Sequence, residues 1–294
     1  MIQGFKRSSI LVRCQAHSLL FYGGSSATGF EALVPKDLAS RRNFSAGCVE
    51  IMLNTLEEYS MSRQTNGILG ILELDEGCPP SSQSFVPHEG SLFNPTTFDV
   101  PVITEMVPRA FADIVIRGDV SLEEASVAAA MRLVHRGATV ITADCGFFIR
   151  HQTAISAAVN VPVITSSLLL IPTLLRQLAP AKMMAVISAD SRYCTPDLFA
   201  VESPIDRARI IVGGIERGEY VRNALARPFL QTSLEQIERE VETCIEQLRA
   251  NHPEIALLLF ECTGLACVAT ASRYKSKLPV YDITNLCRLT LATH

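Results

Sequence analysis

Residues 138–146 read ATVITADCG, and residues 255–264 read IALLLFECTG. Each stretch is an apolar run that ends in an acidic residue and a cysteine, Cys145 in the first and Cys262 in the second. A Pro-Val pair follows each of them, with its proline 17 residues beyond the cysteine. The match indicates an internal duplication, and a repeat of this kind constrains the fold more than any single segment does.

A second apolar run precedes each cysteine at a matching distance. Residues 68–75 (ILGILELD) end 70 residues before Cys145, and residues 183–190 (MMAVISAD) end 72 residues before Cys262. Continuous apolar runs that alternate with amphipathic helices are typical of buried parallel strands, covered by helices on both faces. The sequence therefore predicts an α/β fold of two pseudo-symmetric, flavodoxin-like halves with parallel sheets and an active site in the cleft between them.

The same order of elements is expected in both halves. The expected strands are 68–75, 101–107, 138–143, 183–190, 208–214 and 255–260, the helices are 121–134 and 233–248, and a helix over 166–178 connects the halves. We expect capping boxes, Ser121–Glu124 and Ser233–Gln236, to open the two helices. The first half is predicted to comprise 63–165 plus 284–294, and the second 166–283.

Residues 1–62 are predicted to be an extension outside the fold. The first 50 residues carry six Lys or Arg against three acidic residues, none of them before Glu31. The run 41–46 (RRNFSA) resembles the end of a mitochondrial presequence, so we expect a location in the mitochondrial matrix. The alternative is a cytoplasmic protein with a disordered extension and a start at Met52 or Met61.

The composition excludes several classes of function. With 48% hydrophobic and 19% charged residues the chain is expected to be a soluble globular protein. A net charge of −4 provides no basic field for nucleic acid. The uncharged segment 152–175 contains Pro162 and Pro172, so we expect no membrane span. The nine cysteines show no zinc-type spacing, which predicts reduced thiols and no metal.

Cys145 and Cys262 are the candidate catalytic residues. Both stand at the carboxyl ends of predicted parallel strands, where ligands bind in open sheets. Each is followed by a glycine within two residues and then by a helix-like stretch, whose N-terminus stabilises a thiolate. If the halves face one another, one thiolate removes a proton from a carbon next to a carboxylate and the other thiol returns one to the opposite face. The predicted reaction is racemisation without a cofactor.

These segments resemble a known family. Residues 144–147 and 261–264 are similar to the two active-site motifs of the aspartate/glutamate/hydantoin racemase superfamily, and 67–75 and 93–98 resemble opening segments of one of its less characterised branches. The likeness covers about residues 66–290. It implies a two-half fold, cofactor independence and often a homodimer, and the two retained cysteines favour a racemase that acts on a carboxylate, an amino acid or a hydantoin.

The candidate substrate-binding residues flank the cysteine motifs and the first strand. They are Asp75, Asn94, Thr97, Gly146, Thr263 and Gly264. The chain departs from glutamate racemases, which carry a histidine at the position of Gly264 and Asp-Ser-Gly where this chain has 75–77 (DEG), so glutamate is not the expected substrate. Asp75 is equally compatible with tuning a thiol and with a role in a turn.

Two other classes of function stay open. A decarboxylase or hydrolase would need only one of the two thiols, and a binding protein would retain the cleft without turnover. For a two-base racemase the sulfurs must lie about 6–9 Å apart, because each approaches one carbon to roughly 3–3.5 Å from opposite faces. Residues 76–98 are expected to form part of the rim of the cleft.

Overall fold

The computed structural model describes four stretches of the chain, namely residues 8–14, 17–23, 67–77 and 86–293. The chain divides into two compact units, Met1–Gln64 and Thr65–His294. In the first unit β1 (Ser8–Cys14) and β2 (His17–Gly23) pair as an antiparallel hairpin. The rest of the predicted extension, and with it the proposed presequence, lies outside the described residues.

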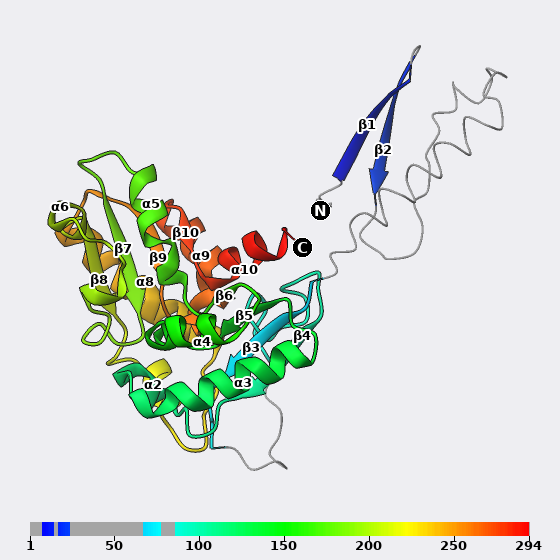
Figure 1. Ribbon diagram of the computed structural model, residues 1–294. Helices are drawn as coiled ribbons and strands as arrows, with labels where there is room; N and C mark the ends of the chain where they lie inside the picture. The colour runs from blue at the N-terminus through cyan, green and yellow to red at the C-terminus, as the bar shows by residue number, and fades with distance from the viewer. Residues whose placement is uncertain (1–7, 15–16, 24–66, 78–85, 294) are drawn as a thin grey trace. The chain divides into compact units, whose positions relative to one another are not determined.

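The second unit contains two parallel sheets with the same strand order (Figure 1). The strands are β3 (Leu69–Glu73), β4 (Val102–Met106), β5 (Val140–Ala143), β6 (Val163–Ile164), β7 (Met183–Ser188), β8 (Ile210–Gly214), β9 (Ile255–Phe260) and β10 (Val280–Tyr281). The first sheet is ordered β4-β3-β5-β6 and the second β8-β7-β9-β10. Because each strand has its counterpart at the same place in the other sheet, the predicted duplication and the α/β fold class are confirmed.

Helices cover these sheets. They are α2 (Ala112–Arg117), α3 (Glu123–His135), α4 (Gln152–Ala158), α5 (Ile171–Gln177), α6 (Pro204–Arg207), α7 (Glu219–Ala224), α8 (Leu234–Asn251), α9 (Ala269–Ser276) and α10 (Ile283–Leu291). Short 3-10 helices are η1 (Val120–Leu122), η2 (Gly146–His151), η3 (Ser167–Leu170), η4 (Pro196–Leu198) and η5 (Thr263–Val268). Figure 1 shows α3 lying along the first sheet, which it contacts at β3 and β4. The predicted connecting helix forms as η3 followed by α5.

The strands are buried because both of their faces carry apolar side chains. All four residues of β5 are buried, as are the last five of β7. One continuous core contains Phe147 and Phe148 from the first half together with Val186 and Leu259 from the second. Full burial of side chains of this size contributes roughly 1.5–3 kcal/mol each. The halves are therefore held in one unit by a shared core.

The first of the two predicted capping boxes is wrong, and the second forms only in part. The carboxylate of Asp119 accepts from the backbone N–H of Ser121 at the start of η1, and α3 continues from there without a side-chain cap of its own. At α8, Ser233 caps the helix by accepting from the N–H of Gln236. The amide of Gln236 does not reach back to the cap but donates to Glu240 at 2.7 Å. The next turn of α8 thus takes the Gln236 amide that the predicted capping box would have used.

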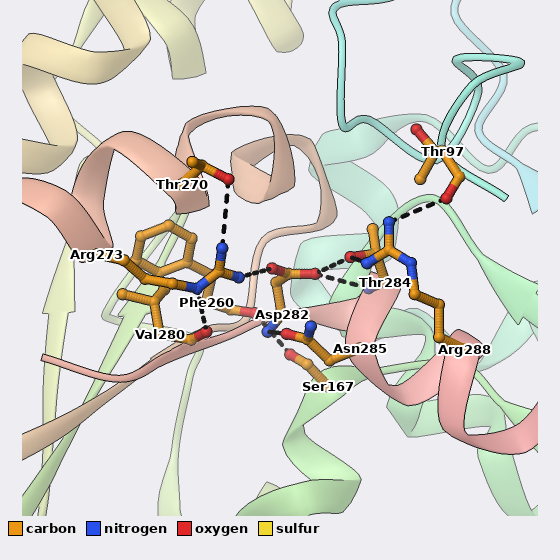
Figure 2. A network of polar contacts seen from close by, with 10 residues as sticks. All are labelled: Thr97, Ser167, Phe260, Thr270, Arg273, Val280, Asp282, Thr284, Asn285 and Arg288. Carbon is orange, nitrogen blue, oxygen red and sulfur yellow. Dashed lines mark hydrogen bonds and ion pairs between the residues drawn. The ribbon is translucent and has the colours of Figure 1, made fainter. Parts of the chain in front are cut away.

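A buried polar network fixes the chain behind the end of β9 (Figure 2). Asp282 is 1% exposed, caps α10 through the backbone and hydroxyl groups of Thr284, and pairs with Arg273 of α9 at 3.5 Å. Arg288 of α10 donates to the carbonyl oxygen of Thr97 at 2.9 Å, which ties α10 to the loop before β4. Ser167 donates to the carbonyl of Phe260, the last residue of β9, at 2.6 Å. This strand end carries the second cysteine motif.

Candidate active site

The two cysteines occupy equivalent positions in the two sheets. Cys145 follows β5 and is the N-cap residue of η2, and Cys262 follows β9 and is the N-cap residue of η5. The residue before each cysteine completes a strand, because Asp144 donates its N–H to Leu72 and Glu261 donates its N–H to Ile187. Each thiol therefore stands where a sheet ends and a helix begins.

The two motifs touch one another. The hydroxyl of Thr263 donates a hydrogen bond to the carbonyl oxygen of Asp144. A Cβ atom on Gly146 would lie 2.3 Å from both the carbonyl oxygen and Oε1 of Glu261, so only glycine fits at this position. The charge of Cys262 contributes to raising the pKa of Cys145. The structure thus brings the predicted pair together at one place between the halves.

Both thiols are protonated at neutral pH. Burial raises the pKa of Cys145 well above its ordinary value, and the neighbouring Glu261 and Cys262 raise it further. Burial and Glu261 raise the pKa of Cys262 to about 12, although hydrogen bonds from Tyr220 and the backbone N–H of Gly264 oppose the rise. The Tyr220 Oη lies 3.5 Å from the Cys262 Sγ. Cys262 therefore has a side-chain donor that supports its thiolate.

Glu261 is a buried carboxyl group beside both thiols. Ser188 donates to its Oε2 at 2.8 Å, and the backbone N–H of Ala189 is a further donor to the carboxylate. No described residue donates to its Oε1, which is buried. Burial raises the pKa of Glu261 to about 7, despite these two hydrogen bonds. The group therefore changes its charge near neutral pH.

A cleft of about 790 Å³ opens next to the two motifs. Tyr220, Thr263, Gly264 and Cys267 line it from the second half, and Asp144 lines it from the first. The predicted rim is present, since the lining includes Glu76 and residues of the segment 86–93. Thr263 and Gly264 thus line the cleft, whereas Cys145, Gly146 and Cys262 lie at the junction of the motifs and are not among the described lining residues.

The wall of the cleft is acidic. Its acidic residues are Glu73, Asp75, Glu76, Asp113 and Asp144, and the Lys or Arg residue among its described lining is Arg227. Arg227 forms an ion pair with Asp113, and its guanidinium stacks 3.8 Å from the centre of the Phe111 ring. Burial raises the pKa of Asp144 well above its ordinary value, and the charges of Glu73 and Glu76 raise it further. The described wall therefore has more acidic than basic side chains, and the Asp144 carboxyl group favours its neutral form.

The chain between α7 and α8 covers one side of the cleft. The Phe229 N–H donates to the carbonyl oxygen of Glu76 at 3.2 Å. The ring N–H of His88 donates to the Thr232 carbonyl at 3.0 Å, and the Gln231 amide donates to the Val86 carbonyl at 3.0 Å. The second half therefore supplies a strap that is hydrogen-bonded to the rim of the first half.

The remaining candidate residues serve the loops. Asp75 lines the cleft, but its carboxylate accepts from the backbone N–H groups of Gly77 and Arg109, both at 3.1 Å. The Asn94 oxygen accepts from Thr96, and the hydroxyl of Thr97 donates to the Ser91 carbonyl at 2.6 Å. Neither Asn94 nor Thr97 is among the described residues that line the cleft. Asp75 thus combines a turn role with a place on the wall.

Sequence reasoning did not select Tyr220, Glu261, Asp144 or Glu73 as site residues. Glu261 and Asp144 had a signal, because each directly precedes a candidate cysteine. Tyr220 had none, since it lies 42 residues before Cys262 in a six-residue helix. Among the described residues, no cluster of three His, Cys, Asp or Glu side chains is placed to hold a metal ion, and no helix is long and apolar enough to cross a membrane.

Comparison with known proteins identifies the family. No family model matches the chain. A dimethylsulfoniopropionate lyase of Durusdinium sp. clade D is 30% identical over 222 residues, which are 73% of this chain and 70% of that protein. The chain belongs to the dimethylsulfoniopropionate lyase family. Dimethylsulfoniopropionate lyases 6 and 7 of Emiliania huxleyi (strain CCMP1516) are each 27% identical, and the match spans 76% of this chain but only 59% and 66% of their lengths.

Solved structures similar to this family member belong to the racemase superfamily. Allantoin racemase from Klebsiella pneumoniae has a TM-score of 0.48 and 13% identity, over 76% of this chain and 86% of that one. Unliganded arylmalonate decarboxylase has a TM-score of 0.43 and 17% identity, over 77% and 92%. Both neighbours are named as enzymes of the kinds that the cysteine motifs resemble, and the likeness concerns the fold alone. With TM-scores below 0.5, these likenesses carry nothing about the reaction.

The predicted reaction class is not confirmed. The curated relatives are named lyases, whereas the sequence motifs favoured an isomerase. This outcome fits the alternative of a lyase that acts on a small carboxylate.

Proposed function

We propose that the chain is a lyase that removes a proton next to a carboxylate and expels a cationic group from the adjacent carbon, as in the cleavage of dimethylsulfoniopropionate. The observation that carries the proposal is the cleft, which joins the Cys262 motif to an acidic wall. A cationic leaving group would be held by that wall while the thiol reaches the neighbouring carbon. The names of the relatives support the same substrate class.

The chemistry of such a lyase begins as racemisation does. A base takes a proton from the carbon next to the carboxylate, and the electron pair of that C–H bond forms a double bond to the next carbon. The C–S bond breaks, and its electron pair leaves with sulfur as neutral dimethyl sulfide. The remaining product is acrylate, and one proton is released in total. Because the sulfide leaves without a proton, elimination needs one base, whereas inversion needs two opposed groups.

The acidic wall suits a sulfonium substrate. Glu73, Glu76 and Asp144 affect one another electrostatically, which places their carboxylates close together on the wall. The ring of Phe93 also lines the cleft, and an aromatic face attracts a cation with a strength of about 0.5–2 kcal/mol. A positive charge in this position offsets the mutual repulsion of the carboxylates. Bound near a thiol, it also favours the thiolate, because an opposite charge lowers a thiol pKa.

Cys262 is the proposed base. Its neighbours Thr263 and Gly264 line the cleft, and so does Tyr220, whose hydroxyl lies 3.5 Å from the Cys262 sulfur. Cys145 has no comparable side-chain donor among the interactions that set its pKa in the described chain. The thiolate therefore forms more readily at Cys262.

The test is product analysis with dimethylsulfoniopropionate in deuterium oxide. We expect release of dimethyl sulfide and acrylate, loss of both products in Cys262→Ser, and a reduced rate in Cys145→Ser. Cys244→Ser, at a buried cysteine on α8, is the matched control and should behave as the wild type. Absence of both products in the wild type, across a panel of sulfonium and ammonium propionates, would refute the proposal.

A two-base racemase is the second candidate. It is favoured by the contact between the motifs, which brings a second thiol beside the first. The same assay separates the two, because a racemase exchanges and inverts the hydrogen next to the carboxylate of an amino acid or hydantoin. It would lose that inversion equally in Cys145→Ser and Cys262→Ser, whereas the lyase requires Cys262 more than Cys145.

A further inference from the structure

Glu261 is a buried carboxyl group that the elimination mechanism does not use. Its side chain is fully buried, with Oε2 bonded to the Ser188 hydroxyl and Oε1 without a donor among the described residues. A carboxylate oxygen that is withdrawn from water without a hydrogen bond is costly. Glu261 therefore lowers the stability of the folded protein, and a destabilising group beside two candidate catalytic thiols points to a role in their proton transfers.

The free oxygen of Glu261 faces the first cysteine motif. It lies where a Cβ atom on Gly146 would be only 2.3 Å away, and Gly146 directly follows Cys145. Glu261 also directly precedes Cys262, and its charge raises the pKa of both thiols. The absence of a side chain on Gly146 thus leaves room for the carboxylate beside the first cysteine motif, and the unpaired oxygen is an acceptor without a donor at this place.

We propose that Glu261 accepts the proton that a site thiol must release, so that it holds the negative charge of the site at rest and returns that charge to sulfur when substrate binds. The inference rests on the thiolate base of the proposed function. Glu261 acts through the thiols and does not touch the substrate.

The proton transfers balance over one cycle. The S–H bond of a thiol breaks and an O–H bond forms at Oε1 of Glu261, which leaves a thiolate and a neutral carboxyl group. The thiolate takes the proton next to the substrate carboxylate, and the sulfide leaves with the electron pair of the C–S bond. Glu261 then loses its proton to solvent and can accept the next one. One proton per substrate reaches solvent, as elimination requires.

The charges around Glu261 leave it free for this role. Cys145, Cys262 and Cys194 face it, and burial raises the pKa of Cys194 so that it stays neutral. On η2, Arg150 is engaged by Asp197 at 3.3 Å and by the Tyr193 carbonyl. The other charged and titratable groups are held elsewhere: Asp190 after β7 pairs with Arg192, and His151 of η2 interacts with Glu123, Asp119 and Arg150. With a pKa of about 7, Glu261 is the most acidic of the three groups formed by itself and the two site thiols.

The decisive variant is Glu261→Gln, which retains the shape and removes the acceptor. Two effects are expected to oppose one another. The thiols should ionise at lower pH, seen in the ultraviolet absorbance of the thiolate, because the negative neighbour is gone. Turnover at pH 7–8 should nevertheless fall by roughly 100- to 10,000-fold, the scale of a lost proton-transfer group. If turnover instead rises with the thiolate fraction, Glu261 only suppresses thiolate formation and the proposal is overturned.

Ser188→Ala provides a second variant in case Glu261→Gln does not fold. The Ser188 hydroxyl lowers the pKa of Glu261, so its loss should move the acidic limb of the pH–rate profile to higher pH. An unmoved limb would contradict the proposal. Glu124→Gln, on the exposed face of α3, is the matched control and should leave both the thiol titration and the profile unchanged.

The two proposals fail in different ways. If the wild type releases no sulfide, the proposed function fails, but the thiol titration needs no substrate and still reports on Glu261. A thiol titration midpoint that falls in Glu261→Gln supports the coupling between the carboxyl group and the thiols. A midpoint that does not move shows that the carboxyl group and the thiols titrate independently, and that overturns this inference alone.

Discussion

Tyr220 and Gly264 form a contact whose two sides can be altered separately. The Tyr220 hydroxyl lies 3.5 Å from the Cys262 sulfur, and a Cβ atom on residue 264 would lie 1.8 Å from that hydroxyl oxygen. Tyr220→Phe removes the hydroxyl, and Gly264→Ala forces it to move by roughly 1.5 Å to reach an ordinary van der Waals distance. Both changes should deprive the Cys262 thiolate of its donor.

The expected effect is about tenfold. A hydrogen bond to a charged group contributes about 1.5–3 kcal/mol, and because Cys262 is half-buried and the bond is long we take the low end. That corresponds to about one pKa unit. At pH 7 the thiolate fraction, and with it kcat/KM, should fall by about a factor of ten in either variant. The deficit should disappear at high pH, where the thiol ionises without help.

The assay is the pH–rate profile of both single variants and of the double variant, together with the thiol titration. Because each change removes the same interaction, the double variant should be no slower than the worse single one. In the Tyr220→Phe background a Cβ on residue 264 no longer meets an oxygen, since the nearest remaining ring atom is 3.0 Å away. Tyr274→Phe, at an exposed tyrosine, is the control. Additive losses, or a pH profile that stays in place, would refute this reasoning.

Three further changes test the framework of the site. The pKa of Glu261 is raised from 4.5 to about 7, so the native state binds this proton more tightly than the unfolded chain does. The free energy of unfolding therefore falls by up to about 3 kcal/mol as the pH rises through this window. In urea unfolding, Glu261→Gln should be more stable than the wild type at pH 8 but not at pH 4.5. Gly146→Ala places a Cβ 2.3 Å from a backbone carbonyl, which should cost about 1–3 kcal/mol, and a variant as stable as wild type would contradict this contact. Asp282→Ala should lose about 2–3 kcal/mol with its buried bonds, against about 1 kcal/mol for Asn285→Ala at the other half of the capping box.

The sequence predicted the frame of the molecule because its strands are buried on both faces. Runs such as 138–143 and 255–260 are apolar without alternation, which is the pattern of parallel strands under helices. Their ends are marked by Cys145 and Cys262, and parallel strands expose their carboxyl ends at one edge of the sheet. Local pattern was therefore sufficient to place both thiols at the same kind of position in the fold.

The remainder of the site depends on contacts between distant segments. Tyr220 reaches Cys262 from α7, whose six residues are too few for a periodic signal. The strap from residues 225–232 meets the rim through backbone carbonyls, which carry no trace in the sequence. Asn94 was a plausible ligand residue by type, but its amide is used within its own loop. The sequence showed which side chains could bind or react, but it could not predict which way each side chain points in the folded protein.

The acidic residues around the two thiols give a physical reason why the site would prefer a substrate that carries a positive charge. The charges of Glu73 and Glu76 raise the pKa of Asp144, as like charges do when they lie close together. A substrate with two carboxylates would add to that repulsion, and its charge would raise the thiol pKa further. A zwitterion would place its cation against the wall and lower the thiol pKa, and the thiolate that it stabilises would then remove the proton next to its carboxylate. Substrate binding would in this way also activate the base. When the C–S bond breaks, the sulfonium becomes a neutral sulfide, so the attraction between the substrate cation and the acidic wall is lost and the products can leave.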